Sequence, residues 1–316
     1  MIAKRTAVYR IPVILAAIVS VAAVLVTQSK TPQHRPSDVA NTTSIATVEL
    51  AADSMEATLV KERIKVRLFR EDALDGIAPV GIEILVDEIS VLHQELREEH
   101  FGNRYPGVAI AHLGESGRLP EVIFATYPGG VRCCWAVSVF TTASNGGKWS
   151  RIDLEEVPAL FDYSGSADFL RDIIRDIDGD GYLEIVDYHS FYGLFCDDGE
   201  VSSPLRIRRV SSGQLVDVTR DPKYLPAHRA QFARLLHFAK GKYVPNRDLP
   251  GLVASGRLVG EGELAWKLMR ERYQEVGSAI GVNEPCWPAE ELHKESFPKA
   301  LDMLLIQNGY GRYQTR

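Results

Sequence analysis

The stretch DIDGDGYLEIVD, residues 176–187, says most about how this chain folds. Its first aspartates alternate with small or apolar residues, Gly181 follows, and the run then turns apolar. Carboxylates at every second position, with a glycine that permits a sharp turn, let one short loop surround a cation with hard oxygens. Carboxylates crowded this closely repel one another unless a positive charge lies between them. The stretch therefore predicts a calcium loop.

The spacing within the loop assigns a position to each group. Asp176, Asp178 and Asp180 occupy the first, third and fifth positions. The carbonyl of Tyr182 can point inward at the seventh position, and Glu184 falls at the ninth. The alternative to a metal site is an aspartate-rich surface turn that holds no ion.

The residues after the loop distinguish two kinds of calcium loop. In an EF-hand, helices flank the loop and the twelfth position, here Asp187, supplies a bidentate carboxylate. In the other kind, the loop leads into a β-strand and the ninth position supplies the last carboxylate. The residues LEIVDYHSFY are rich in β-branched and aromatic types, which favours the strand.

The segment DIDGDGYLEIV resembles the calcium loops of FG-GAP and VCBS repeats, which occur in integrin-like propellers and in many exported bacterial proteins. The resemblance implies a structural calcium ion and the ligands Asp176, Asp178, Asp180, the carbonyl of Tyr182, and Glu184. These families carry many copies, and a closed propeller needs at least four blades. A first copy around GESGRLPE lacks the aspartates, so an open sheet, a sandwich or a partial propeller-like arrangement is expected.

The N-terminus predicts a membrane signal. A basic leader precedes IPVILAAIVSVAAVLVT, residues 11–27, which carries no charge. The basic flank favours an N-terminus in the cytoplasm and a body across the membrane, in the periplasm or outside the cell. The length of the run lies between a signal-peptide core and a membrane span. A single-pass anchor through residues 11–27 is favoured because no small-x-small cleavage site follows, and secretion after signal cleavage stays open.

Export determines how the cysteines are interpreted. The chain has Cys133, Cys134, Cys196 and Cys286, and no CxxC pair that would indicate zinc. An oxidising compartment makes disulfides the expected state of all four.

Two similar stretches of sequence, 63 residues apart, suggest which cysteines form a disulfide. Glu121 precedes Cys133 by twelve residues, and Glu184 precedes Cys196 by twelve. If the similarity is not a chance likeness between β sequences, we expect Cys133 or Cys134 to pair with Cys196.

Composition and periodicity give the domain organisation. We expect a signal anchor at 1–30, a linker at 31–55, a β-rich domain with the calcium loop at 56–222 and a helical region at 223–316. The strand-like runs come first and the helical stripes, such as PAHRAQFARLLHFAK, come last. This order indicates an α+β fold.

Few function classes remain open. The net charge is −6 although segment 1–30 holds only basic charges, so the body is acidic and nucleic-acid binding is not expected. No GxSxG or HExxH motif occurs, SGSAD (164–168) is interpreted as a turn, and HQELREEH (93–100) as a solvated helix face. We expect a membrane-anchored, calcium-binding binding or structural envelope module with a protein or glycan partner and no enzymatic activity. An exported hydrolase acting on a polysaccharide or peptide is the alternative.

Overall fold

The computed structural model divides the chain into two compact units, residues 1–39 and 40–316. It describes residues 44–70, 79–96, 104–114, 118–127, 134–143, 147–154, 157–158, 163–189, 203–241, 246–274 and 295–311. The predicted anchor and its apolar run, 11–27, lie outside these ranges. Within them, no helix has both the length and the apolar character needed to cross a membrane.

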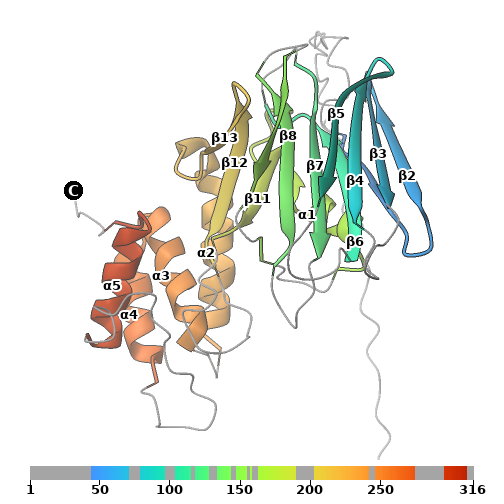
Figure 1. Ribbon diagram of the computed structural model, residues 1–316. Coiled ribbons are helices and arrows are strands. Elements are labelled where there is room, and N and C mark those ends of the chain that lie inside the picture. Colours follow the sequence, from blue (N-terminus) through green and yellow to red (C-terminus); the bar gives the residue numbers. More distant parts are fainter. Residues whose placement is uncertain are drawn as a thin grey trace, which may run out of the picture. The chain divides into compact units, whose positions relative to one another are not determined.

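The first sheet is a four-stranded antiparallel meander (Figure 1). Its strands are β2 (Glu56–Lys61), β3 (Ile64–Arg70), β4 (Val80–Val86) and β5 (Ile89–Leu96). Alternation in IKVRLFR buries Ile64, Val66 and Leu68 and turns the basic residues outward. The expected helix at HQELREEH is wrong over its described part, because His93 lies in β5 and stacks on Phe69.

The second sheet has five strands in the order β1-β6-β7-β8-β9, all antiparallel. They are β1 (Ala46–Glu49), β6 (Arg104–Ala111), β7 (Glu121–Tyr127), β8 (Ala136–Thr142) and β9 (Trp149–Asp153). β1 lies inside the predicted linker. Hydrogen bonding to β6 and the burial of the adjacent Leu50 place this part of the linker in the folded body.

Both faces of the second sheet are buried. Val122 and Phe124 face a core shared with the first sheet, whereas Ile123 and Ala125 face a second core that includes α1 and strands of the third sheet. The near-continuous apolar run VIFAT is therefore a strand covered on two sides.

The third sheet is antiparallel and has the strand order β10-β11-β12-β13. It follows helix α1 in the chain. The elements are α1 (Ser166–Ile173), β10 (Ile174–Arg175), β11 (Glu184–Tyr188), β12 (Leu205–Ser211) and β13 (Gln214–Asp217). The expected turn at SGSAD is wrong in its second half, since Ser166 begins α1. The carboxylate of Glu49 accepts hydrogen bonds from the Ser166 hydroxyl and the Ala167 N–H and so holds this helix start.

Helices make up the rest of the described chain. They are η1 (Pro222–Tyr224), α2 (Leu225–Ala239), η2 (Asn246–Asp248), α3 (Leu249–Leu258), α4 (Gly262–Arg272) and α5 (Phe297–Gln307). Tyr224 packs with Val186 and Ile207 of the third sheet, and the last three helices share a core of their own. The predicted α+β fold is confirmed, with open antiparallel sheets first and the helical region last.

Candidate functional site

The acidic loop lies between two strands of the third sheet. β10 and β11 pair antiparallel, with Ile174 opposite Ile185 and Arg175 opposite Glu184, and the loop joins them. A strand follows the loop, as its β-branched residues predicted. The loop is therefore a hairpin connection, and helices do not flank it directly as they flank an EF-hand loop.

Backbone donors shape the loop around its aspartates. The carboxylate of Asp176 accepts hydrogen bonds from the N–H groups of Gly179 (2.7 Å) and Gly181 (3.0 Å). The carboxylate of Asp178 accepts one from the N–H of Asp180 at 3.1 Å. Gly179 and Gly181 adopt φ values of 78° and 90°, which favour glycine. The aspartates thus hold their own turn in place.

Three carboxylates converge inside this loop. Asp176, Asp178 and Glu184 each offer one oxygen, and these oxygens lie within 4.8 Å of one another. The side chain of Asp178 is 6% exposed and that of Glu184 is fully buried. Oδ2 of Asp178 is buried and accepts no hydrogen bond. Asp180, another predicted ligand, is not one of these three carboxylates; that the Tyr182 carbonyl is a ligand stays a prediction.

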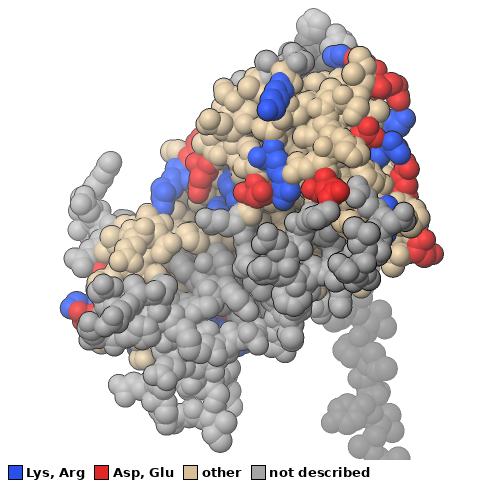
Figure 2. All heavy atoms as spheres, viewed as in Figure 1, with Lys and Arg blue, Asp and Glu red and all other residues tan. Residues whose placement is uncertain are grey.

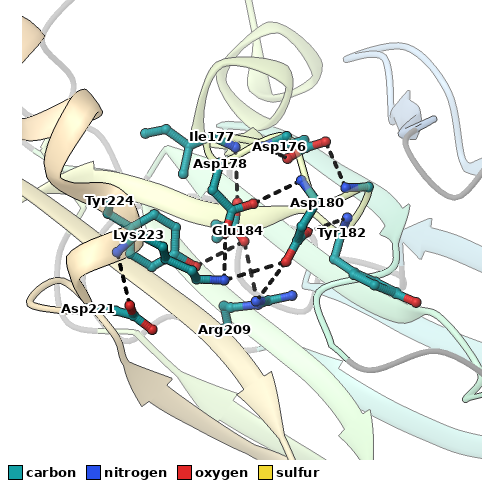
Figure 3. A network of polar contacts seen from close by, with 12 residues as sticks. Asp176, Ile177, Asp178, Asp180, Tyr182, Glu184, Arg209, Asp221, Lys223 and Tyr224 are labelled. Carbon is teal, nitrogen blue, oxygen red and sulfur yellow. Dashed lines mark hydrogen bonds and ion pairs between the residues drawn. The ribbon is translucent and has the colours of Figure 1, made fainter.

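Two side chains from outside the loop bring positive charge to it (Figure 3). Nζ of Lys223 lies 2.5 Å from Oδ2 of Asp178 and 3.4 Å from Oδ2 of Asp180. Arg209 of β12 lies 3.1 Å from Oδ2 of Asp180 and 3.4 Å from Oε1 of Glu184. Since Asp178 Oδ2 accepts no hydrogen bond, its contact with the ammonium is an ion pair.

The turn η1 carries Lys223 to the loop. The ammonium of Lys223 lies 4.7 Å from the ring centroid of Tyr224, and the Tyr224 hydroxyl donates a hydrogen bond of 3.1 Å to Glu184. Asp221 caps η1 by accepting from the N–H of Lys223. Consecutive residues of η1 therefore contact three carboxylates of the loop.

Burial and charge shift the ionisation of these groups in different directions. Burial raises the pKa of Glu184 above its ordinary value, despite hydrogen bonds from the Ile177 N–H and Tyr224. Burial also acts against the charge of Asp178, but Lys223 and the Asp180 N–H hold its pKa below its ordinary value. The pKa of Lys223 is raised, because Asp178 outweighs the effect of burial.

Asp187, the twelfth residue of the stretch, takes no part in the loop. Its fully buried carboxylate receives two bonds from Arg206, at 3.1 and 2.8 Å, and one of 2.5 Å from Arg208. Because two guanidinium groups of the sheet bind this carboxylate, its oxygens are not available to the loop. The EF-hand alternative, which needed Asp187 as a ligand, is therefore wrong.

Glu121 occupies the corresponding place in the second sheet. It begins β7 as Glu184 begins β11, and it is 4% exposed. Its carboxylate accepts from the N–H of Leu113 (2.9 Å) and the hydroxyl of Thr141 (3.4 Å). Burial raises the pKa of Glu121 to about 7.

Of the four cysteines, the structure describes Cys134. Cys134 is disulfide-bonded and buried, and it has a φ of 63°. Cys133, Cys196 and Cys286 lie outside the described residues, so the predicted pairing with Cys196 stays a prediction.

Pockets in the described part of the chain include two whose linings contain none of the three clustered carboxylates. The first encloses about 470 Å³ between η1, α2, α3 and the end of α5, and His228, Arg220 and Arg257 line it. The second, of about 700 Å³, is an open groove on α4 beside Trp266. Neither pocket contains Glu121 or Glu184.

Comparisons with known proteins give one family match and two curated relatives. A family model described as the sll0997 C-terminal domain matches residues 228–309, which run from α2 to just past α5. No solved structure matches the chain.

Two curated relatives extend the similarity. The chain is 28% identical over 211 residues to "Probable thylakoid lumen protein sll0997" of Synechocystis sp., covering 64% of this chain and 59% of that protein. It is 27% identical over 223 residues to "Uncharacterized protein y4bJ" of Sinorhizobium fredii, covering 67% of this chain and 34% of that protein. The chain therefore spans less than two thirds of either relative.

Proposed function

We propose that this chain is an exported, non-enzymatic module in which the loop between β10 and β11 binds a structural calcium ion. The observation that carries the proposal is the convergence of three carboxylates: Asp176, Asp178 and Glu184 each place an oxygen within 4.8 Å of the others, and the side chains of Asp178 and Glu184 are buried. A buried carboxylate oxygen of this kind is costly unless a cation neutralises it.

The donor set fits calcium in its chemistry. Calcium takes six to eight hard oxygens, and three carboxylates already converge. Asp180, the carbonyl of Tyr182 and water would complete the shell. The likeness of the loop to FG-GAP and VCBS calcium loops supports the same ion. A dissociation constant of about 10⁻⁴–10⁻³ M suits an extracellular module of this kind.

Export is supported by two independent observations. Cys134 is disulfide-bonded, which is typical of proteins in oxidising compartments. One relative is named a probable thylakoid lumen protein, and a lumen, like a periplasm, lies across a membrane from the site of synthesis. We infer a periplasm-like location for the body, with residues 11–27 as its single-pass membrane anchor; secretion after cleavage of that segment is the other outcome.

A protein or glycan is the proposed partner, and nucleic acid is not. On the face drawn in Figure 2, the coloured basic and acidic side chains are interspersed, whereas nucleic-acid binding needs a clustered basic surface. The hydrolase alternative calls for paired carboxylates in a cleft. Glu121 and Glu184, whose pKa values burial raises, line neither pocket, so a binding or structural role is better supported.

Thermal unfolding in calcium and in chelator tests the proposal. With calcium at about ten times the dissociation constant, the wild type should gain about 1.4 kcal/mol and its Tm should rise by a few degrees. Asp178→Asn keeps the side-chain volume but removes the charge, and it should abolish the calcium-dependent rise.

Asp168→Asn is the matched control, because Asp168 is an exposed aspartate on α1 that pairs with Arg171. This variant should keep the full calcium response. Identical melting curves of the wild type in calcium and in chelator would contradict the proposal.

A further inference from the structure

We propose that Lys223 is an internal competitor for the divalent cation: its ammonium occupies the acidic loop in the metal-free protein and leaves when calcium binds. The inference rests on the proposed calcium site and deepens it, because it names the residue that sets the affinity. It also assigns a conformational consequence to binding.

The position of the ammonium is the first step of the argument. Nζ of Lys223 lies 2.5 Å from the buried Oδ2 of Asp178, and Asp178 is one of the three carboxylates that converge. Among the described residues, the Lys223 ammonium is the only cationic group that forms an ion pair with Asp178. An ion bound by Asp178 through this oxygen must therefore take the place of the ammonium.

Coulomb repulsion is the second step. A calcium ion held by Asp178 and Glu184 and an ammonium at its present distance from Asp178 would be close neighbours in a partly buried site. Like charges a few ångströms apart in such surroundings repel strongly. Because the two cations exclude each other, occupancy by one weakens the other.

The two cationic side chains are not equivalent. Arg209 contacts Asp180 and Glu184, and Asp180 lies outside the cluster whose oxygens converge. The ion pair between Arg209 and Asp180 can persist while a calcium ion binds Asp176, Asp178 and Glu184. The carbon chain of Lys223 is flexible and the side chain is one-third exposed, so it can leave without moving a strand.

Release of Lys223 reaches beyond the loop. Lys223 belongs to η1, which leads directly into α2, and both Lys223 and Tyr224 hold η1 on the loop. Without the ammonium contact, η1 is held by the Tyr224 hydroxyl on Glu184 and by the packing of Tyr224 on Val186 and Ile207. Calcium binding should therefore remove one polar contact between the acidic loop and η1 and leave the apolar contact in place.

Calorimetric titration of the full chain with calcium chloride tests the competition. Lys223→Met keeps an apolar chain of similar length and removes the charge. Its affinity for calcium should exceed that of the wild type by about tenfold, which corresponds to about 1.4 kcal/mol. Lys223→Arg keeps the charge and should not gain affinity. Lys267→Met, on the exposed face of α4, is the matched control and should bind like the wild type.

A second measurement uses the wild type and needs no variant. Acetylation of lysines by an amine-reactive ester, read by mass spectrometry, should become several-fold faster at Lys223 when calcium is added. The rate at Lys267 should not change.

The outcomes separate this inference from the proposed function. If wild type and Lys223→Met bind calcium equally and the acetylation rate of Lys223 is unaffected, the competition is overturned and the calcium site stands. If only Lys223→Met binds, calcium does not displace the ammonium in the native chain, which overturns both the inference and calcium binding by the wild type. If neither binds, both are overturned.

Discussion

Two buried glutamates begin β7 and β11 in two antiparallel sheets, and the charges around them differ. Glu121 in the second sheet accepts a backbone N–H and a threonine hydroxyl, and no described cationic side chain forms an ion pair with it. Glu184 in the third sheet also accepts a backbone N–H and a hydroxyl, but Arg209 lies 3.4 Å away and the acidic loop precedes it.

The difference shows that a buried glutamate at the first residue of a strand can have either of two roles. Because burial outweighs the hydrogen bonds and the charge of Arg118, the pKa of Glu121 rises to about 7, so the group can stay neutral and tie the β6–β7 connection to its strand. With aspartates in front of it, Glu184 joins the group of carboxylates for which we propose a bound cation. The predictions below alter one side of this comparison at a time.

The largest effect is expected at Glu184. Glu184→Ala removes the acceptor for the Ile177 N–H and for Tyr224, and takes one carboxylate from Arg209. We expect a loss of about 3 kcal/mol in the free energy of unfolding, measured with urea. Glu121→Ala, which leaves no ion-pair partner behind, should lose about 2 kcal/mol or less. Equal losses would break the distinction between the two positions.

The second prediction concerns pH and Glu121. Its pKa is about 7 in the folded protein against 4.5 for the ordinary group, so the folded state keeps a proton that the unfolded state releases. The resulting stability is full below pH 4.5 and is lost as pH rises through 7. The loss should amount to about 2–3 kcal/mol.

Glu121→Gln isolates this effect. The variant should be more stable than the wild type at pH 8, and its advantage should disappear at pH 4, in urea unfolding at both values. A wild type and a variant with parallel pH profiles between 4.5 and 8 would show that Glu121 is ionised normally in the fold.

The smallest effect is expected from Lys223 in the absence of calcium. Lys223→Met leaves Asp178 without its ion-pair partner, yet the lysine is one-third exposed. We expect a loss of about 0.5–1 kcal/mol at low salt, which shrinks at high salt. Lys267→Met, whose ion pair is more exposed, should lose less. A loss at Lys223 that does not depend on salt would point to packing rather than charge.

The parts of the site that the sequence could predict are the local ones. Asp176, Asp178 and Glu184 are separated by few residues, so their convergence follows from a tight turn and the strand after it. The β-branched residues after the loop correctly predicted that strand. Proximity in the chain made both inferences possible.

Contacts from distant segments could not be found in this way. Lys223 and Arg209 reach the loop only because β12 pairs with β11 and η1 packs on Val186 and Ile207. Nothing in the sequence next to Lys223 marks it as a partner of Asp178. A tertiary ion pair of this kind carries no periodic or spacing signal.

Two secondary-structure predictions failed for a related reason. Ala46–Glu49 is too short to show a strand period, and its pairing with β6 makes it β1. The segment around His93 has a charge pattern that suits a solvated helix, but it forms the outer strand of a meander beside β4. In both places a neighbouring strand decided the structure, not the local propensity.

A crystal structure of the full chain, grown with calcium at about 10 mM and compared with crystals grown in chelator, tests the central claim most directly. The account predicts an ion bound by Asp176, Asp178 and Glu184 in the calcium crystals, with the Lys223 ammonium displaced from Asp178. Crystals in which Lys223 stays on Asp178 and no ion lies between the carboxylates would contradict it.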